Sequence, residues 1–316
     1  MKIVTFGEIR GLHIPKTSFY TWTHELLEQK DEMVLPAKIS MKYYNGDGFF
    51  NIMPTIIPSL KTAGIKTIIR NPNHTPSLTG DLLLYDTETN ELLAVMDATY
   101  ITAFRTGAMA AYAINTLAIA DYSVISFIGL GNISRATLSV LSQTNEFLNR
   151  KINIKLFKYN KHEIDFYSQF KVLPNVQFEF CNTIEELVAN TNVLISAVTV
   201  ANSIIAEPEL FTPGVLLVPV HTKGFQTCDL VFDKVIVDDF EHVRGFKYFE
   251  QFKECHELAQ VLKLPSLGRN NERQRIIAYN VGMAIQDVYF AKKIYDMISI
   301  DSNTSDKKSI PQYWVQ

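Results

Sequence analysis

Cysteine is scarce in this sequence. Only three occur among 316 residues, Cys181, Cys228 and Cys255, and no two of them form a CxxC pair. An odd, widely spaced set gives neither a disulfide framework nor a zinc knuckle, so nothing here predicts a metal site. Because disulfides persist mainly in oxidising compartments, we expect reduced thiols in a cytoplasmic protein.

The chain also lacks an excess of charge and a long apolar run. It has 30 Lys and Arg against 33 Asp and Glu, a formal charge of −3, so nucleic acid is not expected as a partner. The N-terminal MKIVTFGEIR carries no apolar stretch of the secretory type. No segment approaches the roughly 18 apolar residues of a membrane span. With 47% hydrophobic residues, the chain reads as soluble and globular, with no membrane partner.

The two ends of the chain mix strands and helices. Residues 66–70, 81–86 and 92–96 are β-rich, and the last two form a predicted hairpin. A helix rich in alanine is expected from about residue 102 to residue 119. Apolar residues recur at helical spacing from 275 to 295, which predicts a closing helix. The polar tail, 299–308, is expected to be frayed.

The middle of the chain alternates strand and helix. A helix is predicted over about 133–148. The length of 316 residues favours about two domains. Repeated strand–helix units imply a parallel, doubly wound sheet of the Rossmann type. The predicted buried strands are 123–128, 152–157, 176–180, 193–196, 215–218 and 234–237.

A dinucleotide-binding signal lies at the first of these strands. Gly129-Leu-Gly131-Asn-Ile-Ser134 closes the strand and opens a helix, with serine in place of the third glycine. Glycines at such a turn let backbone N–H groups approach a pyrophosphate at the positive end of the helix. The motif alone is weak evidence for dinucleotide binding, and its position between a predicted strand and a predicted helix strengthens that evidence. We expect Gly129, Gly131, Asn132 and Ile133 to bind NAD or NADP.

The choice between these cofactors stays open. No carboxylate follows the second strand before Glu163, although an Asp or Glu there would bind the ribose of NAD. Asn160 is a candidate for a ribose hydroxyl, and Lys158 and Lys161 for a 2′-phosphate. A solvated strand end is an equally good interpretation of these lysines.

Several motifs, in order and at consistent spacing, carry a resemblance to a known family. They are Met53-Pro54, Gly64-Ile-Lys66, the Thr102-Ala-Phe-Arg105-Thr-Gly-Ala run, Gly129-Leu-Gly131 and Gly282-Met-Ala-Ile-Gln-Asp287. The sequence resembles the ornithine cyclodeaminase/μ-crystallin family. The resemblance implies a discontinuous α+β domain for substrate binding and dimerisation, residues 1–117 and 276–316, around a Rossmann domain, residues 118–275. It also implies a homodimer, with the site between the domains.

The resemblance also implies individual site residues. Lys38 and Arg105 match cations that hold a substrate carboxylate, Lys66 matches the site lysine, and Met53 lies in the same motif set. A guanidinium grips a carboxylate bidentately, and a desolvated lysine can exchange a proton. Further cofactor contacts are expected at Thr102, Ala197, Val198, Thr199, Asn280 and Gly282.

One departure from the family pattern concerns the loop after residue 220. Cyclodeaminases carry a catalytic aspartate there, and an ungapped alignment on Asp229-Leu230 puts Lys223 at its position. Lys223 then becomes a candidate substrate ligand. His221 is a candidate acid or base, because the ordinary pKa of histidine is near neutral, and Asp229 would orient it or cap a turn.

Function follows as an expectation. We expect an NAD(P)-dependent oxidoreductase that acts on the C–N bond of an amino or imino acid. The alternatives are a cyclodeaminase that forms proline and ammonia from ornithine with internally recycled NAD, and a non-enzymatic binder of the μ-crystallin type. Residues 43–51 are either an aromatic lid or an ordinary hairpin turn.

Overall fold

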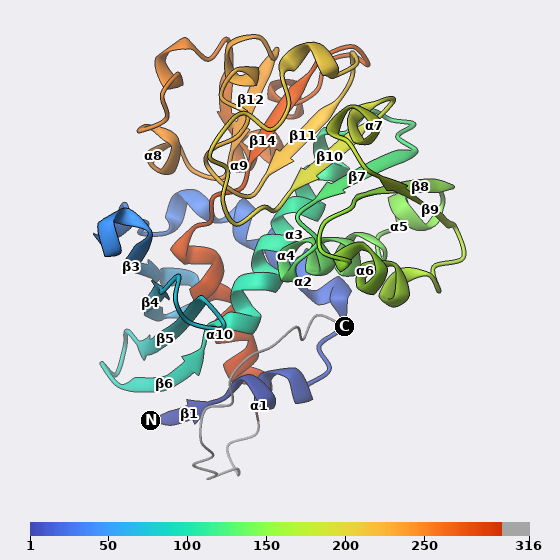
Figure 1. Ribbon diagram of the computed structural model, residues 1–316. Helices are drawn as coiled ribbons and strands as arrows, with labels where there is room; N and C mark the ends of the chain where they lie inside the picture. Colours follow the sequence, from blue (N-terminus) through green and yellow to red (C-terminus); the bar gives the residue numbers. More distant parts are fainter. Residues whose placement is uncertain (299–316) are drawn as a thin grey trace. The chain divides into compact units, whose positions relative to one another are not determined.

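Figure 1 shows the computed structural model of the protein, in which residues 1–298 are described. The predicted frayed tail, 299–308, lies outside these residues. Contacts divide the chain into two units. The first comprises residues 1–105 and the segment that begins at Met283, and the second comprises Thr106–Gly282. The domain bounds expected from the sequence lie at 117/118 and 275/276, and where the functional domains meet stays a prediction.

The first unit contains a mixed six-stranded sheet in the order β1-β6-β5-β4-β3-β2. Neighbouring strands are antiparallel except for β1 and β6. The expected hairpin is present as β5 and β6. The strands are β1 (Lys2–Val4), β2 (Ile39–Tyr43), β3 (Gly48–Ile57), β4 (Thr62–Arg70), β5 (Leu78–Asp86) and β6 (Leu92–Asp97). Residues 43–51 comprise the end of β2, the turn Tyr44–Gly46 and the start of β3, as the hairpin alternative expects.

Helix α10 (Ala284–Met297) covers one face of this sheet. It packs against β3, β4 and β5. Gly64 permits this contact, because a β-carbon there would lie 2.5 Å from Val288 Cγ2. Helices α1 (Phe6–Gly11) and α2 (Lys16–Glu28) belong to the same unit. Aromatic rings of α2, α3 (Thr99–Leu117) and α10 pack together at Phe19, Trp22, Phe104 and Phe290.

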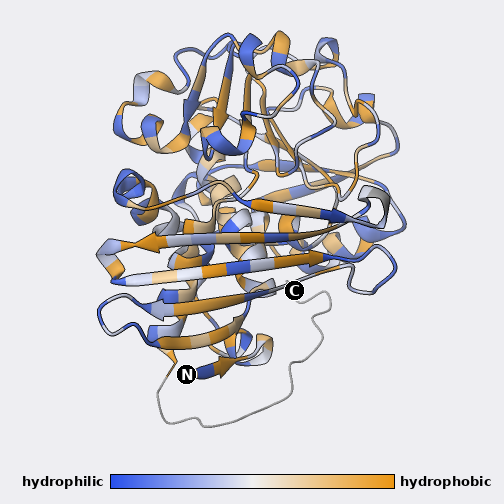
Figure 2. Cartoon of the chain, turned by 90° about the vertical axis from the view of Figure 1, so that its left-hand side faces the viewer, coloured by the Kyte–Doolittle hydropathy of each residue, from blue (hydrophilic) through white to orange (hydrophobic). Residues whose placement is uncertain are grey.

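The opposite face of this sheet carries no described helix (Figure 2). The strand register places ten aliphatic, methionine and phenylalanine side chains on it. Several are open to solvent, including Ile39 at 55% and Ile69 at 44% exposure. The ten residues are Ile3, Ile39, Met41, Phe50, Ile52, Ile56, Ile65, Ile69, Leu83 and Val95.

The second unit contains an eight-stranded sheet in which every pair of neighbours is parallel. Its order, β13-β12-β14-β11-β10-β7-β8-β9, reverses direction around β7, as in a doubly wound sheet. This confirms the predicted α/β fold class. The strands are β7 (Val124–Ile128), β8 (Ile152–Phe157), β9 (Val176–Cys181), β10 (Val193–Ser196), β11 (Leu216–Pro219), β12 (Lys234–Val237), β13 (Cys255–Glu257) and β14 (Ile276–Tyr279).

The alanine-rich helix is α3 (Thr99–Leu117), and its small residues allow a close helix–helix contact. A β-carbon on Gly107 would lie 2.6 Å from the Ala136 carbonyl carbon on α4. The other helices of this unit are α4 (Asn132–Leu141), α5 (Asn145–Leu148), α6 (His162–Phe170), α7 (Ile184–Val188), α8 (Phe240–Val243) and α9 (Leu258–Lys263). Among the described residues, none of the helices combines the length and the apolar character needed to cross a bilayer.

Two expected helices were wrong in extent. The apolar run that begins at residue 275 is first a buried strand, β14, and the helix α10 starts only at Ala284. Four consecutive buried residues in β14 fit a strand covered on both faces as well as they fit a helix. The helix expected over 133–148 is interrupted after Leu141 and resumes as α5.

Candidate active site

A buried group of charges lies in the first unit. Lys66 on β4 donates from Nζ to Asp287 Oδ1 on α10 at 2.7 Å. Arg105 on α3 donates from Nε to the same oxygen at 3.1 Å. The side chains of Lys66 and Asp287 have no exposed surface, and that of Arg105 is 7% exposed. Two cations therefore share one carboxylate oxygen in the interior.

The register of the sheet explains how the predicted substrate residues meet. Met53 pairs with Lys66 across β3 and β4, so both point to the face that α10 covers. Ile39 pairs with Ile52, and continuing this register by one residue places Lys38 opposite Met53. Since directly paired residues share a face, Lys38, Met53 and Lys66 form one row across the sheet. The structure thus brings together the three predicted residues of this row and Arg105.

Burial dominates the electrostatics of this row. It lowers the pKa of Lys66 to about 7; the Asp287 carboxylate opposes this shift, and the charges of Arg105 and Lys38 add to it. With Lys66 protonated, its ammonium and the Arg105 guanidinium share the single Asp287 carboxylate oxygen. Arg105 engages Asp287 through Nε, which leaves its two terminal nitrogens as a fork for a second carboxylate. The site has the charge and the donor geometry to bind an organic acid.

The predicted dinucleotide loop adopts the required conformation. Gly129 follows β7 with φ = +81°, and a β-carbon there would lie 2.5 Å from the backbone of Ala197. Gly131 is the N-cap of α4 without a side-chain cap, and no atom lies within 4 Å of where its β-carbon would be. The space beside Gly131, at the start of α4, is thus open, as a pyrophosphate at the helix N-terminus requires. Ser134 Oγ donates to Gly129 O at 2.6 Å and fastens the loop to the helix.

Other predicted cofactor residues lie at the carboxyl ends of the parallel strands in the same sheet. Ala197, Val198 and Thr199 follow β10, and Asn280 follows β14. Two buried amide atoms there, Asn132 Oδ1 and Asn280 Nδ2, lack a hydrogen-bond partner among the described residues. Polar atoms of this kind suit a ligand, so the residues present fit a dinucleotide.

The remaining cofactor predictions are placed differently. Gly282 has φ = +93° and donates its N–H to Asp238 Oδ2, which fixes the backbone before α10. Thr102 belongs to the first unit, where its hydroxyl donates to Ala98 O at 2.6 Å. Both hydrogen bonds form within the protein and do not require a ligand.

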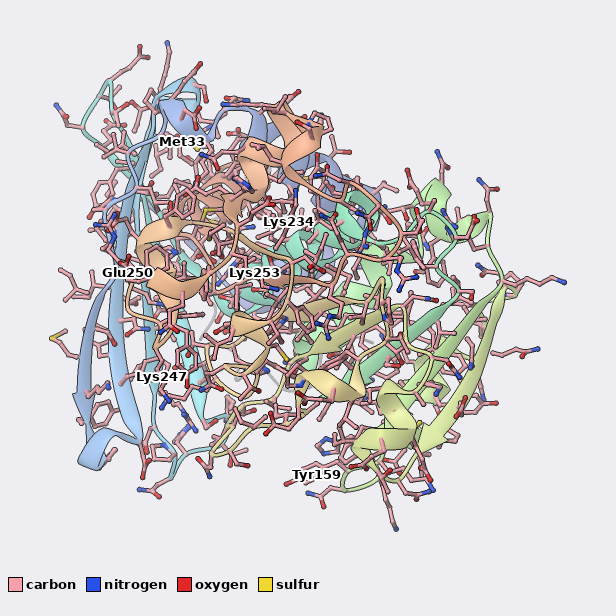
Figure 3. All side chains as sticks on the ribbon, turned by 90° about the horizontal axis from the view of Figure 1, so that it is seen from above. Met33, Tyr159, Lys234, Lys247, Glu250 and Lys253 are labelled. Carbon is pink, nitrogen blue, oxygen red and sulfur yellow. The ribbon has the colours of Figure 1, made fainter. Side chains whose placement is uncertain are left out.

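The end of β8 presents cations to solvent. Asn160 and Lys161 both have positive φ, at 51° and 67°, and both are exposed. The neighbouring Tyr159 points outward, as Figure 3 shows. The first carboxylate after the strand, Glu163, is buried and accepts the Tyr159 N–H at 3.1 Å. The predicted NAD or NADP choice at this loop stays open.

His221 and Asp229 do not pair with each other. His221 Nε2 lies 2.7 Å from Ser196 Oγ, and burial lowers the histidine pKa. Asp229 is buried and accepts from the Tyr279 hydroxyl at 2.8 Å, while burial raises its pKa to about 7. Lys223 is exposed. The structure therefore gives His221 a serine partner that sequence reasoning missed.

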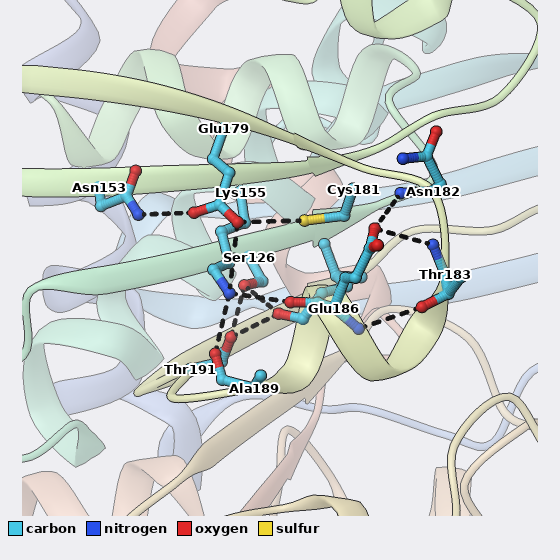
Figure 4. Close-up of polar contacts among 11 residues, drawn as sticks. Ser126, Asn153, Lys155, Glu179, Cys181, Asn182, Thr183, Glu186, Ala189 and Thr191 are labelled. Carbon is cyan, nitrogen blue, oxygen red and sulfur yellow. Dashed lines mark hydrogen bonds and ion pairs between the residues drawn. The ribbon is translucent and has the colours of Figure 1, made fainter.

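Two further buried lysines belong to the second unit, and their partners are mainly backbone carbonyls. Lys155 Nζ donates to Glu186 O at 2.8 Å and Ala189 O at 2.9 Å, which fastens the end of α7 (Figure 4). Lys234, labelled in Figure 3, donates to Leu267 O at 3.2 Å. Each also has a carboxylate nearby: Lys155 Nζ lies 3.8 Å from Glu179 Oε1, and Lys234 Nζ lies 3.2 Å from Glu254 Oε2. These lysines satisfy helix and turn ends, and both carboxylates are about half exposed.

Sequence reasoning missed the pairing of Asp287. The residue was part of the closing motif, but it carried no assigned role. Its position on an otherwise apolar helix face, next to Val288, was the available signal, because a buried carboxylate requires a cation.

Comparison with known proteins decides the family. The model of the ornithine cyclodeaminase/mu-crystallin family matches residues 16–302. The chain belongs to this family. Among curated relatives, N-((2S)-2-amino-2-carboxyethyl)-L-glutamate dehydrogenase of Staphylococcus aureus is 27% identical over 259 residues, which are 76% of this chain and 74% of the relative.

Solved structures of similar fold cover nearly the whole chain. Thermococcus litoralis Δ1-pyrroline-2-carboxylate reductase, in complex with NADH and L-proline, superposes with a TM-score of 0.84 at 22% identity, covering 94% of this chain and 97% of that one. An archaeal alanine dehydrogenase dimer with bound NAD gives 0.81 at 23% identity, covering 94% and 95%. At such identities the likeness establishes the fold of this family member. Its distant homologues include reductases and dehydrogenases of amino and imino acids.

Proposed function

We propose that this member of the ornithine cyclodeaminase/mu-crystallin family is an NAD(P)-dependent oxidoreductase acting on the C–N bond of an amino or imino acid. The observation that carries the proposal is the buried cluster of Lys66, Arg105 and Asp287, with Lys38 in the same row. Two buried cations share one oxygen of Asp287, and Arg105 uses only its Nε for this contact, so its two terminal nitrogens are available for a second carboxylate.

The substrate carboxylate binds to Arg105 in this proposal. The Nε contact with Asp287 holds the guanidinium plane, so that the two terminal nitrogens form parallel hydrogen bonds to the acid. Lys38 adds a second cation from the sheet edge, and Met53 provides an apolar floor next to Lys66. Lys223, on the surface of the second unit, has no assigned role in this step.

The dinucleotide binds through the second unit. Gly129, Gly131 and the first turn of α4 hold the pyrophosphate, and Asn132 and Asn280 use the amide atoms that lack partners. When bound, the nicotinamide supplies or accepts the hydride. Both NAD and NADP stay within the proposal; the two structural neighbours described above contain NADH or NAD.

Proton transfer to the substrate nitrogen needs a group that titrates near neutral pH. In reduction of an imine, the carbon receives a hydride and the nitrogen receives a proton. Lys66 has a pKa of about 7, close to the pH at which the proton is transferred, as an efficient general acid requires. His221 is the second candidate, held by Ser196. Asp229 is engaged by Tyr279 and does not orient His221.

The names of the homologues support the same reaction class. One relative is a dehydrogenase of an amino-acid derivative, and the two structural neighbours are an imino-acid reductase and an alanine dehydrogenase. The cyclodeaminase alternative requires a carboxylate in the loop where this chain has Lys223. The pure binding alternative leaves the buried, near-neutral Lys66 without a use.

We also propose a cytoplasmic homodimer that buries the outer face of the six-stranded sheet. That face is apolar, and exposed apolar patches of such extent mark association sites. One structural neighbour is described as a dimer. Ile39→Lys with Ile69→Lys should give a monomer in light scattering, whereas Lys61→Gln, at the exposed β3–β4 turn, should leave the mass unchanged. A wild-type monomer would contradict the dimer.

The reaction is tested by the absorbance of reduced nicotinamide. We expect oxidation of NADH or NADPH when a cyclic imino acid, or a 2-oxo acid with an amine, is added. Arg105→Ala should abolish turnover and leave cofactor affinity intact. Gly131→Ala should lower the affinity for the cofactor, because the added methyl group meets no atom of the folded chain but would occupy space beside the pyrophosphate. Ammonia release from ornithine at constant cofactor absorbance would instead establish the cyclodeaminase.

A further inference from the structure

The groups that set the proton affinity of Lys66 come from three elements. Asp287 comes from α10, Arg105 from α3, and Lys38 from the segment before β2. The first stabilises the ammonium, and the other two repel it. Among the described residues, Asp287 is the one carboxylate in direct contact with Lys66 and Arg105, and the side chains of all three residues are buried.

Asp287 serves both buried cations through one atom. Its Oδ1 accepts from Lys66 and from Arg105, and its Oδ2 has no partner among the described residues. The carboxylate therefore holds the lysine nitrogen beside the guanidinium. Any anion that the guanidinium captures will lie close enough to act on the lysine charge, since coulombic effects on a pKa reach across several ångströms in a buried site.

We propose that Lys66 takes up a proton when a substrate carboxylate binds at Arg105 and Lys38, and that Asp287 is the positioning residue for this coupling. The inference rests on the proposed function, because it takes Arg105 as the carboxylate ligand. The arriving negative charge offsets the repulsion from Arg105 and Lys38. Solvent supplies the proton, the only bond formed is N–H, and the ammonium then stands ready as the acid of the reductive reaction.

The coupling differs from a permanent salt bridge. If Lys66 were protonated at all times, ligand binding would exchange no proton with solvent. In the coupled site, the empty protein holds a mixture of amine and ammonium near pH 7, and the complex holds ammonium. The acid is therefore fully formed only when a carboxylate is present.

Calorimetric titration of the full chain with pyruvate measures this exchange. Pyruvate has a carboxylate and no amine, so its own protons do not contribute, and methyl pyruvate is the matched ligand without the charge. Titrations in buffers of different ionisation enthalpy give the number of protons taken up at each pH. We expect uptake that approaches one proton per site at about pH 8 and vanishes at about pH 5, where Lys66 is protonated in both states.

Four variants test the origin of the uptake. Asp287→Asn should move its maximum to lower pH by about one to three units, because the ammonium loses its counter-ion. Lys38→Gln should move the maximum to higher pH, and Asp287→Glu should restore the wild-type position. Glu25→Gln is the matched control, since Glu25 accepts from Tyr289 and pairs with Lys293 on the same helix α10, away from Lys66.

The outcomes separate the inference from the function on which it rests. Pyruvate that binds without proton exchange at any pH overturns the inference and leaves the carboxylate role of Arg105 standing. If neither pyruvate, L-alanine nor a cyclic imino acid binds, the proposed function itself is contradicted. If Asp287→Asn does not fold, the Lys38→Gln titration decides, because an unmoved maximum in that variant also overturns the coupling.

Discussion

Two buried lysines, one in each unit, occupy opposite kinds of surroundings. Lys155 lies on β8 and donates to two carbonyl oxygens at the end of α7. Lys66 lies on β4 and shares its acceptor with Arg105. The first lysine completes hydrogen bonds that the fold leaves open, and the second stands in a cluster with more cations than anions. Burial of a lysine is therefore no sign of a site until its neighbours are counted.

The largest expected effect is on kcat, which should fall when Lys66 is replaced but not when Lys155 is replaced. Lys66→Met should lower kcat by about 10²–10⁴-fold, the usual contribution of a positioned acid. Lys155→Met should leave the kcat of the folded protein unchanged. Steady-state rates, normalised to folded protein by circular dichroism, measure this. Equal losses in both variants would remove the distinction drawn here.

A substitution at Arg105 that keeps the positive charge but changes the shape of the group tests how the site of Lys66 holds its substrate. Arg105→Lys should raise the KM for the carboxylate substrate by on the order of tenfold or more, because an ammonium cannot form the bidentate pair. Cofactor affinity, measured by fluorescence of the reduced nicotinamide, should stay the same. A KM close to that of the wild type would show that the guanidinium fork does not hold the substrate.

For the free energy of unfolding we expect the opposite order, with a larger loss on replacing Lys155 than on replacing Lys66. Lys155→Met leaves two buried carbonyls without a donor and should lower the free energy of unfolding by about 2–4 kcal/mol. Lys66→Met should lower it less at pH 7, because Arg105 still pairs with Asp287. Urea unfolding of both variants gives the comparison. A larger loss for Lys66→Met would make its salt bridge mainly structural.

The pH dependence of Lys66 has a defined sign. Its folded pKa, about 7, lies below the unfolded value of 10.5, so the unfolded chain binds more protons between these values. The wild-type free energy of unfolding should therefore rise relative to Lys66→Met from pH 7 to pH 10, by at most about 1.4 kcal/mol per unit. Urea midpoints at several pH values test this, and a flat difference would contradict the lowered pKa.

Asp229 offers the smallest and opposite effect. Its folded pKa, about 7, lies above the ordinary 3.8, so the folded chain holds the extra proton between these values. Stability should fall as pH rises from 4 to 7, and Asp229→Asn should remove this slope. The amide can still accept from Tyr279. An unchanged slope in the variant would assign the pH dependence to other groups.

The sequence singled out candidate residues but not the contacts between them. Lys66 and Arg105 were identified from local motifs, but Asp287 lies 221 and 182 positions away from them. Only the packing of α10 over Gly64 brings its carboxylate to both cations. The helix expected from residue 275 failed for a related reason: whether Ile276 and Ile277 form a strand depends on β11 and β12 on either side, and no local period records those neighbours.

Ser134 illustrates what the third position of a dinucleotide fingerprint demands. Its side chain is fully buried, and its hydroxyl returns to the carbonyl of Gly129. The physical requirement at that position is a small group that does not separate helix from strand, and a hydroxymethyl meets it while adding a tether. A motif pattern written strictly for glycine would pass over this chain, whereas one written for side-chain volume would retain it.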